Sequence, residues 1–463
     1  MSRNKIDQPR NLAYTLLIRV LEDGAYAHLV VQNYLENSGL EKRDRSFALA
    51  IFYGVLEKLY TLDFYLKKYV SRDFQSLEPA VRTILRMGAW QILYANSVPD
   101  FAAVKESVEL LRIYSNEGAA KMGNAVLRTM SKAVESQEIS PEKEALDIRY
   151  SLPKELVGCF KKWFGTERAE SILSSFTGVP TVSVRVNKLH IQPGQLSEKL
   201  SQESVATSSA VLLENAALTI LLDGKNPNEI KAHQDGLFMI QDEGAMLAAL
   251  IAAPQLENRV LDVCAAPGGK ACHLAELMQN KGEIIALDIY PERVKKIQEN
   301  AERLGIEIIK AQQGDAADAE MLADEIAMSS FDVVLADVPC SGLGLLRKKP
   351  DIRMNMTYEK MQEILPVQQK ILAESSKFVR PGGVLIYSTC TINPNENIGQ
   401  IKYFLEKNPE FTPVSFEEII TAEMGEKAEI HRDEARLGYI TLLPDNDGCD
   451  GFFIAKMQRQ LKV

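Results

Sequence analysis

Two cysteines that follow predicted strands could supply nucleophiles. Cys340 closes the segment Asp337-Val-Pro-Cys340, and Cys390 closes the segment Tyr387-Ser-Thr-Cys390, 50 residues further along the chain. A single cysteine in such a place is usually a small buried hydrophobe. Two cysteines at the carboxyl ends of strands suggest covalent catalysis instead, because a thiolate is a strong nucleophile.

Methylation of a cytosine at C5 is a reaction that would use both thiols. C5 is too weak a nucleophile to attack a methylsulfonium unaided, but a thiolate that adds to C6 makes the ring an enamine whose C5 can take the methyl group. The ring must meanwhile accept a proton or a strong hydrogen bond at N3 or N4, a task suited to Asp337. A base must then remove the C5 proton before the thiolate can leave. We therefore expect Cys340, Cys390 and Asp337 to be catalytic, with one thiol adding and the other helping release.

A glycine-containing loop between a predicted strand and a predicted helix indicates a nucleoside site. Residues 262–270 read DVCAAPGGK, in which Gly268 and Gly269 allow close approach of a ligand to the backbone, and the helix start offers free N–H groups. A phosphate-binding P-loop would need glycine at 264 and Ser or Thr at 271, where the chain has Cys264 and Ala271. The GxGxxG dinucleotide pattern is absent as well. A nucleoside ligand is therefore favoured over a phosphate.

Acidic residues end three consecutive predicted strands beside this loop. Asp262 ends the first strand, and Asp288 ends the second, where its two acceptor oxygens suit the two ribose hydroxyls. Asp315 follows the third strand and could reach an adenine amine. Each acid alone is more often a helix cap or a loop residue. Together with the glycine loop, their order resembles that of S-adenosylmethionine-dependent methyltransferases.

The elements that must position these residues form a helical region followed by alternating strands and helices. Apolar residues recur at three- and four-residue spacing through residues 12–24, 45–70, 81–94 and 101–114, which predicts helices. Residues 151–240 mix helical segments with a strand-like alternation at 181–189. Strands are then predicted at 260–264, 283–289, 306–312, 331–338 and 384–390, with helices between them. This alternation predicts a parallel, doubly wound sheet that binds ligands beyond the carboxyl ends of its strands.

The composition is that of an ordinary globular protein. The 463 residues are 46% hydrophobic and 25% charged, with a net charge of −10, and the length suggests about three domains at ~150 residues each. The six cysteines form no CxxC pair and no Cys/His cluster, which argues against a zinc site and against structural disulfides. No apolar run approaches the ~20 residues of a membrane span, and the first residues lack the apolar segment of a signal peptide. We expect a cytoplasmic enzyme with no metal and no membrane partner.

The acidic net charge does not exclude a nucleic-acid partner, because the charge is unevenly distributed. Residues 1–150 contain 20 Lys and Arg against 19 Asp and Glu, whereas the rest of the chain contains 33 against 44. Local basic patches matter more for phosphate binding than the total charge does. The N-terminal third is therefore the relatively basic part of the chain.

Several segments together resemble the RNA (cytosine-C5) methyltransferases, and closely the bacterial 16S rRNA members of that family. The segments are RVN (185–187), QDEGAMLAA (241–249), DVCAAPGGK (262–270), DVPCSGLGLLRKKPDIR (337–353), YSTCTINPNEN (387–397) and DGCDGFFIAKM (447–457). The N-terminal segments RDRSFALAIFYGVLEK, VRTILRMGAWQILY and NAVLR are similar to the NusB-like RNA-binding domain. The resemblance covers the whole chain.

The resemblance implies roles for particular residues. It makes Cys390 of the Thr-Cys motif the nucleophile and gives Cys340 of the Pro-Cys motif a part in release, whereas DNA cytosine methyltransferases use the Pro-Cys thiol as nucleophile. It also implies S-adenosyl-L-methionine as cofactor and 16S ribosomal RNA, naked or in an early small-subunit assembly intermediate, as partner of a monomeric enzyme. The implied cofactor-binding residues are Cys264, Ala265, Ala266, Pro267, Gly268, Gly269, Lys270, Asp288, Asp315 and Asp337.

These observations predict an all-α, NusB-like N-terminal bundle followed by a Rossmann-like, doubly wound α/β methyltransferase domain with a small α+β RNA-binding subdomain. We expect the NusB-like RNA-binding domain at 1–135, a linker at 136–150, the small subdomain at 151–240 and the catalytic domain at 241–463. The basic residues after the Pro-Cys motif are either a solvated loop or a phosphate clamp beside the target base. They are Arg347, Lys348, Lys349 and Arg353.

Two other functions fit parts of the sequence. A non-catalytic RNA-binding or antitermination factor would retain the helical region, but the intact Cys340 and Cys390 beside a complete glycine loop argue against a decayed enzyme. A small-molecule methyltransferase would leave the helical region and the second thiol unexplained. Transfer of labelled methyl groups to RNA distinguishes the three.

Overall fold

The chain folds into two compact units. The computed structural model describes residues 7–35, 39–178, 180–222, 226–323 and 326–461. The first unit comprises Met1–Thr177 together with Lys348–Thr357, and the second comprises Gly178–Arg347 together with Tyr358–Val463. No helix among the described residues is long and apolar enough to cross a membrane.

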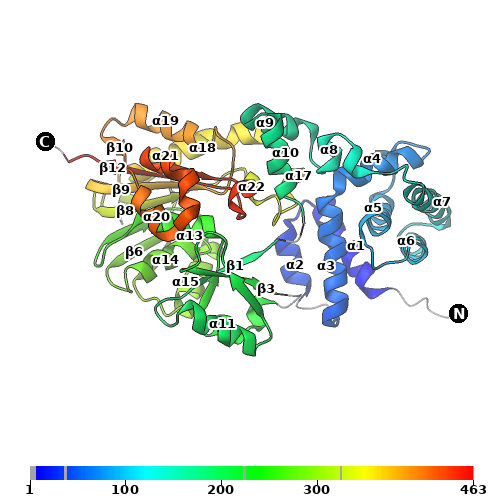
Figure 1. Ribbon diagram of the computed structural model, residues 1–463, viewed down its shortest axis with the longest axis horizontal. Coiled ribbons are helices and arrows are strands. Elements are labelled where there is room, and N and C mark those ends of the chain that lie inside the picture. The colour runs from blue at the N-terminus through cyan, green and yellow to red at the C-terminus, as the bar shows by residue number, and fades with distance from the viewer. Residues whose placement is uncertain (1–6, 36–38, 179, 223–225, 324–325, 462–463) are drawn as a thin grey trace. The chain divides into compact units, whose positions relative to one another are not determined.

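The first unit is built from helices, as the apolar periodicity predicts. Figure 1 shows α5, α6 and α7 packed side by side in this unit. Its helices are α1 (Gln8–Leu21), α2 (Ala27–Leu35), α3 (Lys42–Glu57), α4 (Leu59–Tyr69), α5 (Pro79–Tyr94), α6 (Asp100–Tyr114), α7 (Glu117–Glu135), α8 (Leu146–Arg149), α9 (Lys154–Phe164), α10 (Thr166–Ser175) and α17 (Ile352–Asn355).

Local sequence signals explain where these helices begin and end. Pro79 occupies the first turn of α5, where its missing N–H costs nothing, and the Asn116 side chain accepts the N–H of Ala119 at the start of α7. The periodic stretch 45–70 does not form one helix, because Lys58 leaves the helical conformation (φ −103°, ψ 16°) and separates α3 from α4. The apolar pattern alone does not mark that break.

The division into two units differs from the expected domain boundaries in two places. Helices α9 and α10 belong to the first unit, although the sequence suggested that the small subdomain begins at 151. Residues Lys348–Thr357, which follow the Pro-Cys motif, also belong to the first unit. The chain therefore leaves the second unit after Arg347 and returns to it at Tyr358.

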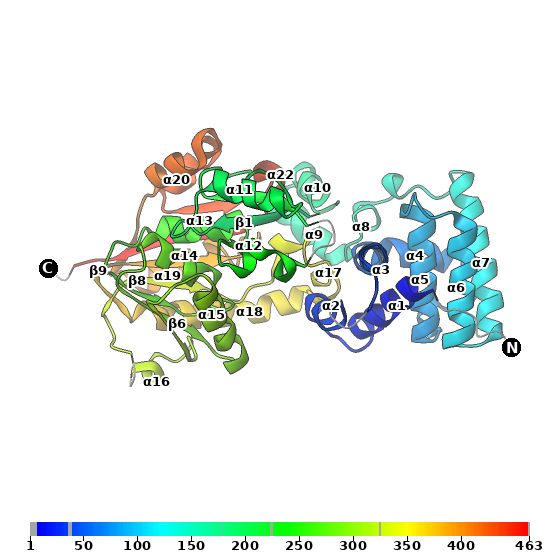
Figure 2. The same cartoon turned by 90° about the horizontal axis from the view of Figure 1, so that it is seen from below.

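The second unit contains a small antiparallel sheet with strand order β2-β3-β1-β4 among the described residues. Figure 2 shows its strand β1 with the neighbouring helices α11 and α12. Val184 and Val186 of β1 pack with Leu196 and Leu200 of α11 in one apolar cluster. The elements are β1 (Val182–Val186), α11 (Pro193–Gln202), β2 (Ala206–Ser209), β3 (Ala217–Leu221), α12 (Lys231–Gln234) and β4 (Phe238–Ile240).

The larger sheet has strand order β10-β12-β9-β8-β5-β6-β7 in the described part of the chain, with β11 paired to β12. Strands β7, β6, β5, β8 and β9 are mutually parallel, and β12 runs antiparallel to β9. The predicted doubly wound sheet is thereby confirmed. The strands are β5 (Arg259–Asp262), β6 (Glu283–Asp288), β7 (Ile309–Gln313), β8 (Phe331–Asp337), β9 (Val379–Thr389), β10 (Phe411–Pro413), β11 (Tyr439–Leu442) and β12 (Phe452–Arg459).

Helices cover both faces of this sheet, as a parallel sheet requires. In β8, Val333 and Leu335 pack into the core on one face, whereas Val334 and Ala336 pack into the core on the other. Figure 1 shows α14 and α15 on one side of the strands and α18 and α19 on the other. The helices are α13 (Glu243–Ala252), α14 (Gly269–Leu277), α15 (Pro291–Arg303), α16 (Ala319–Ala323), α18 (Tyr358–Ser376), α19 (Ile398–Lys407), α20 (Glu417–Met424), α21 (Arg432–Arg436) and α22 (Pro444–Asp447).

Candidate active site

The two cysteines meet at the carboxyl ends of neighbouring parallel strands. Strand β8 ends at Asp337, three residues before Cys340, and β9 ends immediately before Cys390. The register of the two strands places Asp337 opposite Ser388. As a result Cys340 Sγ and Cys390 Sγ lie 3.3 Å apart, within hydrogen-bond distance for sulfur.

The thiol of Cys340 is held in its neutral form. Its hydrogen bond with Cys390, its burial, and the negative charges of Cys390 and Glu396 raise its pKa well above the usual value for cysteine. Since two thiolates 3.3 Å apart would repel each other, at most one of the pair is ionised. The neutral Cys340 can therefore donate its S–H to Cys390.

The remaining cysteines have no comparable environment. Burial raises the pKa of the Cys272 thiol to about 12 and raises the pKa values of Cys264 and Cys449 as well. Cys159 lies in α9 of the first unit, and burial also raises its pKa. These thiols are not activated as nucleophiles.

Asp337 is held between the helix after the glycine loop and the strand that leads to Cys390. Lys270 Nζ lies 2.7 Å from Asp337 Oδ2, and Ser388 Oγ donates to Asp337 Oδ1 at 2.6 Å. Burial disfavours the charge of Lys270, but the carboxylates of Asp337 and Asp262 outweigh it, and the pKa of Lys270 is raised. Asp337 therefore has a fixed orientation and a charged partner.

The glycine loop follows β5 and turns directly into α14. Gly268 has φ +102°, in the region that favours glycine, and a Cβ there would lie 3.2 Å from the Ile297 backbone. The loop is fastened to its neighbours because the Ala265 N–H donates to Leu287 O at the end of β6, and Asn300 Nδ2 donates to Pro267 O. The loop residues 264–270 therefore lie beside the carboxyl ends of β5 and β6.

Of the acidic residues expected to bind the nucleoside, Asp288 ends β6 and Asp315 lies two residues after the end of β7. Asp288 is 3% exposed; its Oδ1 accepts the Tyr290 N–H and its Oδ2 lies 3.3 Å from Arg293. A carboxylate offers about four acceptor sites, so Asp288 keeps capacity for two ribose hydroxyls. Asp315 also shapes its own turn, since its Oδ1 accepts the Ala317 N–H at 2.9 Å. This set of acceptors beside the glycine loop fits the nucleoside part of S-adenosylmethionine.

Asp262 lies beneath this region and is fully buried. Burial, with a contribution from the negative charge of Asp337, raises its pKa to about 7, although Lys270 opposes the shift. Asp262 is thus a titratable group at neutral pH in the middle of the sheet.

The RVN segment turns out to be structural. Arg185 is 1% exposed and forms a two-pronged ion pair with Glu276 of α14, and it also donates to Gly269 O at 2.8 Å and to Gln241. Asn187 is buried and donates to Gly236 O and Leu304 O. These contacts fasten the small sheet to the glycine loop within the second unit.

The four basic residues after the Pro-Cys motif do not share one environment. Arg353 is 1% exposed in the first unit, where it donates to Tyr150 O at 2.7 Å and Phe176 O at 3.2 Å. Burial lowers its pKa to about 10. Arg353 is therefore neither a solvated side chain nor a phosphate clamp, and that expectation is wrong for this residue. Lys349, by contrast, is exposed.

Several residues that the motif analysis did not single out join the two cysteine loops. Ser341 Oγ and Thr391 Oγ1, each adjacent to one cysteine, lie 2.7 Å apart, and the Gly344 N–H donates to Cys390 O. Gly344 has no room for a side chain, since a Cβ there would lie 1.9 Å from Gly451 O. Gly451, at the end of the segment DGCDG (447–451), also donates its N–H to Gly344 O at 3.1 Å and so supports the loop that follows Cys340. These residues belong to the sequence segments quoted above, but the spacing of the segments does not show which of the residues contact one another.

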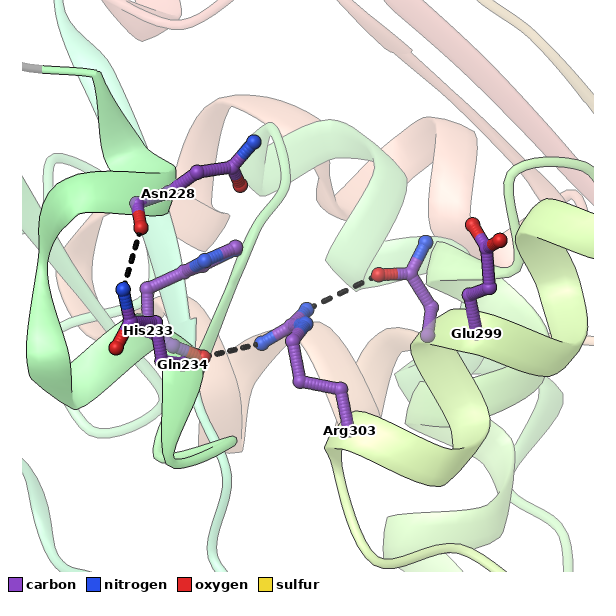
Figure 3. A pocket seen from close by; sticks show the side chains of 6 residues that line it. Asn228, His233, Gln234, Glu299 and Arg303 are labelled. Atoms are coloured by element: carbon purple, nitrogen blue, oxygen red, sulfur yellow. Dashed lines mark hydrogen bonds between the residues drawn. The ribbon is translucent and has the colours of Figure 1, made fainter.

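A pocket of about 320 Å³ opens elsewhere in the second unit. Figure 3 shows that it lies between the α12 region and α15, where Arg303 Nη1 donates to His233 O and Gln234 donates to Asn228 O. Burial and the charge of Arg303 lower the pKa of His233 to about 4. His233 is therefore neutral at pH 7. Among the described residues, no group of three or more potential ligands could hold a metal ion.

The doubly wound sheet, the glycine loop and the paired thiol loops define a Rossmann-like methyltransferase preceded by a helical domain. Residues 249–458 match the family described as 16S rRNA methyltransferase RsmB/F, and residues 7–132 match the NusB family. The chain is 34% identical to the "Probable ribosomal RNA small subunit methyltransferase B" of Bacillus subtilis, over 97% of this chain and 98% of that protein. It is 31% identical to the ribosomal RNA small subunit methyltransferase B of Shewanella oneidensis, over 86% of this chain and 90% of that protein. The chain belongs to the ribosomal RNA small subunit methyltransferase B family.

Solved structures support the same fold. The protein PH0851 superposes with a TM-score of 0.79 at 24% identity, over 98% of this chain and 99% of that protein. A methyltransferase homolog from Pyrococcus horikoshii superposes with a TM-score of 0.55 at 25% identity, over 70% of this chain and 100% of that protein. The predicted NusB-like bundle and Rossmann-like domain are confirmed.

Proposed function

We propose that the protein methylates C5 of a cytosine in 16S rRNA, through a covalent bond between Cys390 and C6 that is released with the help of Cys340. The observation that carries this proposal is the 3.3 Å separation of the two thiols at the ends of β8 and β9, beside the Lys270–Asp337 pair. The relatives named above are ribosomal RNA small subunit methyltransferases, which supports a ribosomal substrate.

Electrostatics favour Cys390 as the thiol that attacks. The thiol of Cys340 is kept neutral by its hydrogen bond with Cys390, by burial and by nearby negative charge, which raise its pKa. The positive charge of Lys270 interacts favourably with negative charge on Cys390. A thiolate on Cys390 would thus be stabilised by Lys270 and by the S–H of Cys340.

Addition of Cys390 forms the bond between Sγ and C6 and moves the electrons of the C5–C6 double bond into the ring. A proton that Asp337 takes up from solvent would be shared with N3 and neutralise the charge that the ring gains, and it would return to Asp337 when the thiolate leaves. S-adenosylmethionine, bound by residues 264–270, Asp288 and Asp315, would supply an electrophilic methyl group for C5. The fixed position of Asp337 between Lys270 and Ser388 suits this task, because a placed group needs no reorganisation.

Release requires loss of the C5 proton and cleavage of the bond between Sγ and C6. Once Cys390 is bonded to C6, its sulfur is uncharged and no longer accepts a hydrogen bond from a thiol as strongly. The hydrogen bond that raises the pKa of Cys340 most is then weakened, although burial and the charge of Glu396 still raise it. In the proposed release step Cys340 gives its proton to solvent, accepts the C5 proton and so allows Cys390 to leave as a thiolate. The balance of the reaction is one proton released for each methyl group transferred.

We further propose that the helical first unit docks the rRNA. The N-terminal third is less acidic than the rest of the chain, and residues 7–132 match the NusB family. Electrostatic attraction to phosphates supplies much of the affinity for RNA. The target base must be single-stranded or flipped out for a thiol to reach C6.

Methyl transfer and its position test the proposal. The full chain is incubated with a 16S rRNA transcript, or with small-subunit assembly intermediates, and methyl-labelled S-adenosylmethionine. The RNA is then mapped by bisulfite sequencing, which detects 5-methylcytosine. We expect label in RNA at a cytosine C5. Label at another atom, or RNA binding without any methyl transfer, would contradict the proposal and favour a non-catalytic RNA-binding protein.

A further inference from the structure

Glu396 and Asn397 are consecutive buried residues, and each is hydrogen-bonded, directly or through Gln368, to the residues that flank one of the two cysteines. They follow β9 and directly precede α19, and they are 0% and 2% exposed. Tyr387 Oη, within β9, donates to Glu396 O at 2.6 Å and fixes the backbone of this pair. Neither residue bonds to a sulfur atom in the hydrogen bonds that the structure describes for them.

Glu396 holds the loop of Cys340. Its Oε2 accepts the Ser341 N–H at 2.8 Å and a hydrogen bond from Gln368 Nε2 at 3.1 Å. The same Gln368 nitrogen donates to Pro339 O at 2.9 Å. The residues immediately before and after Cys340 are therefore both tied to the Glu396 carboxylate, one directly and one through Gln368.

Asn397 holds the loop of Cys390 in the same manner. Its Oδ1 accepts a hydrogen bond from Thr389 Oγ1 at 2.6 Å, and its Nδ2 donates to Thr391 O at 2.9 Å. The residues immediately before and after Cys390 are both bound to this one side chain. Because Glu396 and Asn397 are joined by a peptide bond, the two thiol loops share one anchor.

We infer that Glu396 and Asn397 are positioning residues that set the distance and orientation of the two thiols, Glu396 for Cys340 and Asn397 for Cys390. The inference rests on the proposed function in one respect: the two thiols must reach adjacent atoms, C6 and C5, of one base. Small errors of placement are costly for such a reaction, since a misplacement of about 1 Å can reduce a rate ~10²-fold. Each thiol acts at a different step, so loss of each anchor should impair a different step.

The first experiment measures, without RNA, how well the two thiols are placed to form a disulfide with each other. The full chain is oxidised with diamide, which takes up two protons and two electrons and leaves a disulfide, and the Cys340–Cys390 disulfide is followed by non-reducing peptide mapping. We expect Glu396→Gln and Asn397→Ala to form it at least about tenfold more slowly than the wild type. Asn395→Ala is the matched control, because Asn395 belongs to the same motif and is exposed. Wild-type rates in both anchor variants would overturn the inference.

The second experiment separates the two steps in the reaction. With a 16S rRNA transcript and S-adenosylmethionine, Asn397→Ala should slow formation of the covalent protein–RNA adduct ~10²-fold, whereas Glu396→Gln should raise the ratio of adduct to methylated product. An unchanged ratio in Glu396→Gln, with adduct formation equally slowed in both variants, would overturn the assignment of one anchor to each thiol. The affinity of each variant for S-adenosylmethionine, measured by calorimetry, verifies that the variant is folded. If Asn397→Ala unfolds, Asn397→Asp replaces it, because the aspartate keeps the acceptor for Thr389. If the wild type neither forms an adduct nor methylates RNA, the proposed function fails, and the diamide experiment still decides the positioning role.

Discussion

Lys270 Nζ lies 2.7 Å from Asp337 Oδ2, and this ion pair joins the helix after the glycine loop to the strand that leads into Cys340. Asp337 Oδ1 accepts a hydrogen bond from Ser388, two residues before Cys390. One carboxylate thereby connects the region assigned to the methyl donor with both thiol loops. An ion pair of this kind, largely shielded from solvent, orients its members more than it stabilises the fold.

The two cysteines should give opposite phenotypes. Cys390→Ala should abolish methylation and any covalent link to RNA, because no thiolate then adds to C6. Cys340→Ala should still allow addition and methyl transfer but slow release by about 10²–10⁴-fold, the usual contribution of a placed proton acceptor. Denaturing gel electrophoresis with 16S rRNA should show a shifted adduct band only for Cys340→Ala.

The control for that experiment is Cys159→Ala, since Cys159 lies in the helical first unit. It should behave as the wild type. An adduct trapped by Cys390→Ala, with Cys340→Ala inactive and free of RNA, would reverse the two roles and give the arrangement of the DNA enzymes.

Asp288→Ala should weaken binding of S-adenosylmethionine. The ribose hydroxyls would lose a charged acceptor worth roughly 1.5–3 kcal/mol, which is about tenfold or more in affinity. Calorimetric titration measures the loss, and Asp433→Ala, which removes an exposed carboxylate, is the control. Equal affinities in the two variants would remove Asp288 from the site.

Asp262 should make stability depend on pH near neutrality. Burial and the charge of Asp337 raise its pKa to about 7 from an unfolded value of 3.8. The folded state therefore binds the extra proton between these values, so the contribution of Asp262 to stability is full below pH ~4 and is lost as the pH rises through ~7. Asp262→Asn cannot titrate and should show a flatter profile. Urea unfolding at pH 5, 6, 7 and 8 measures both proteins, and parallel curves would show that Asp262 does not titrate in this range.

Arg353→Ala should reduce stability through the first unit. It leaves the carbonyl groups of Tyr150 and Phe176 without their buried donor, at a cost of about 1–3 kcal/mol. Lys349→Ala, a change in an exposed basic residue of the same segment, should remain within about 0.5 kcal/mol of the wild type. Thermal and urea unfolding measure both variants. A loss of RNA affinity in Arg353→Ala with unchanged stability would restore the phosphate-clamp hypothesis.

Much of the second unit could be predicted from the sequence because its strands carry local signals. Strand β8 (Phe331–Asp337) alternates residues between two apolar cores and ends in the acid that precedes the Pro-Cys motif. Such periodicity is a property of neighbouring residues. The rules for parallel sheets with helical crossovers leave only a few strand orders, and the observed order β7-β6-β5-β8-β9 is one that they allow.

The roles of particular charged residues could not be predicted in this way. Arg353 lies among basic residues in the sequence, yet it is buried among carbonyl groups of the first unit, and Arg185 is buried against Glu276 of α14. Whether an arginine faces solvent or a buried partner depends on which distant segments pack around it. The grouping of α9 and α10 with the first unit depends in the same way on contacts between segments that are distant in the sequence.

The sequence by itself determined the chemical types: two cysteines after strands, three acids at strand ends, and a glycine loop before a helix. Only the tertiary structure decided that Cys340 and Cys390, 50 residues apart, lie 3.3 Å from each other, and that Glu396 and Asn397 anchor their loops. The reason is physical. Strand and turn preferences act over a few residues, whereas the distance between two thiols depends on the pairing of β8 with β9 and on side chains that are satisfied only when those segments are buried together.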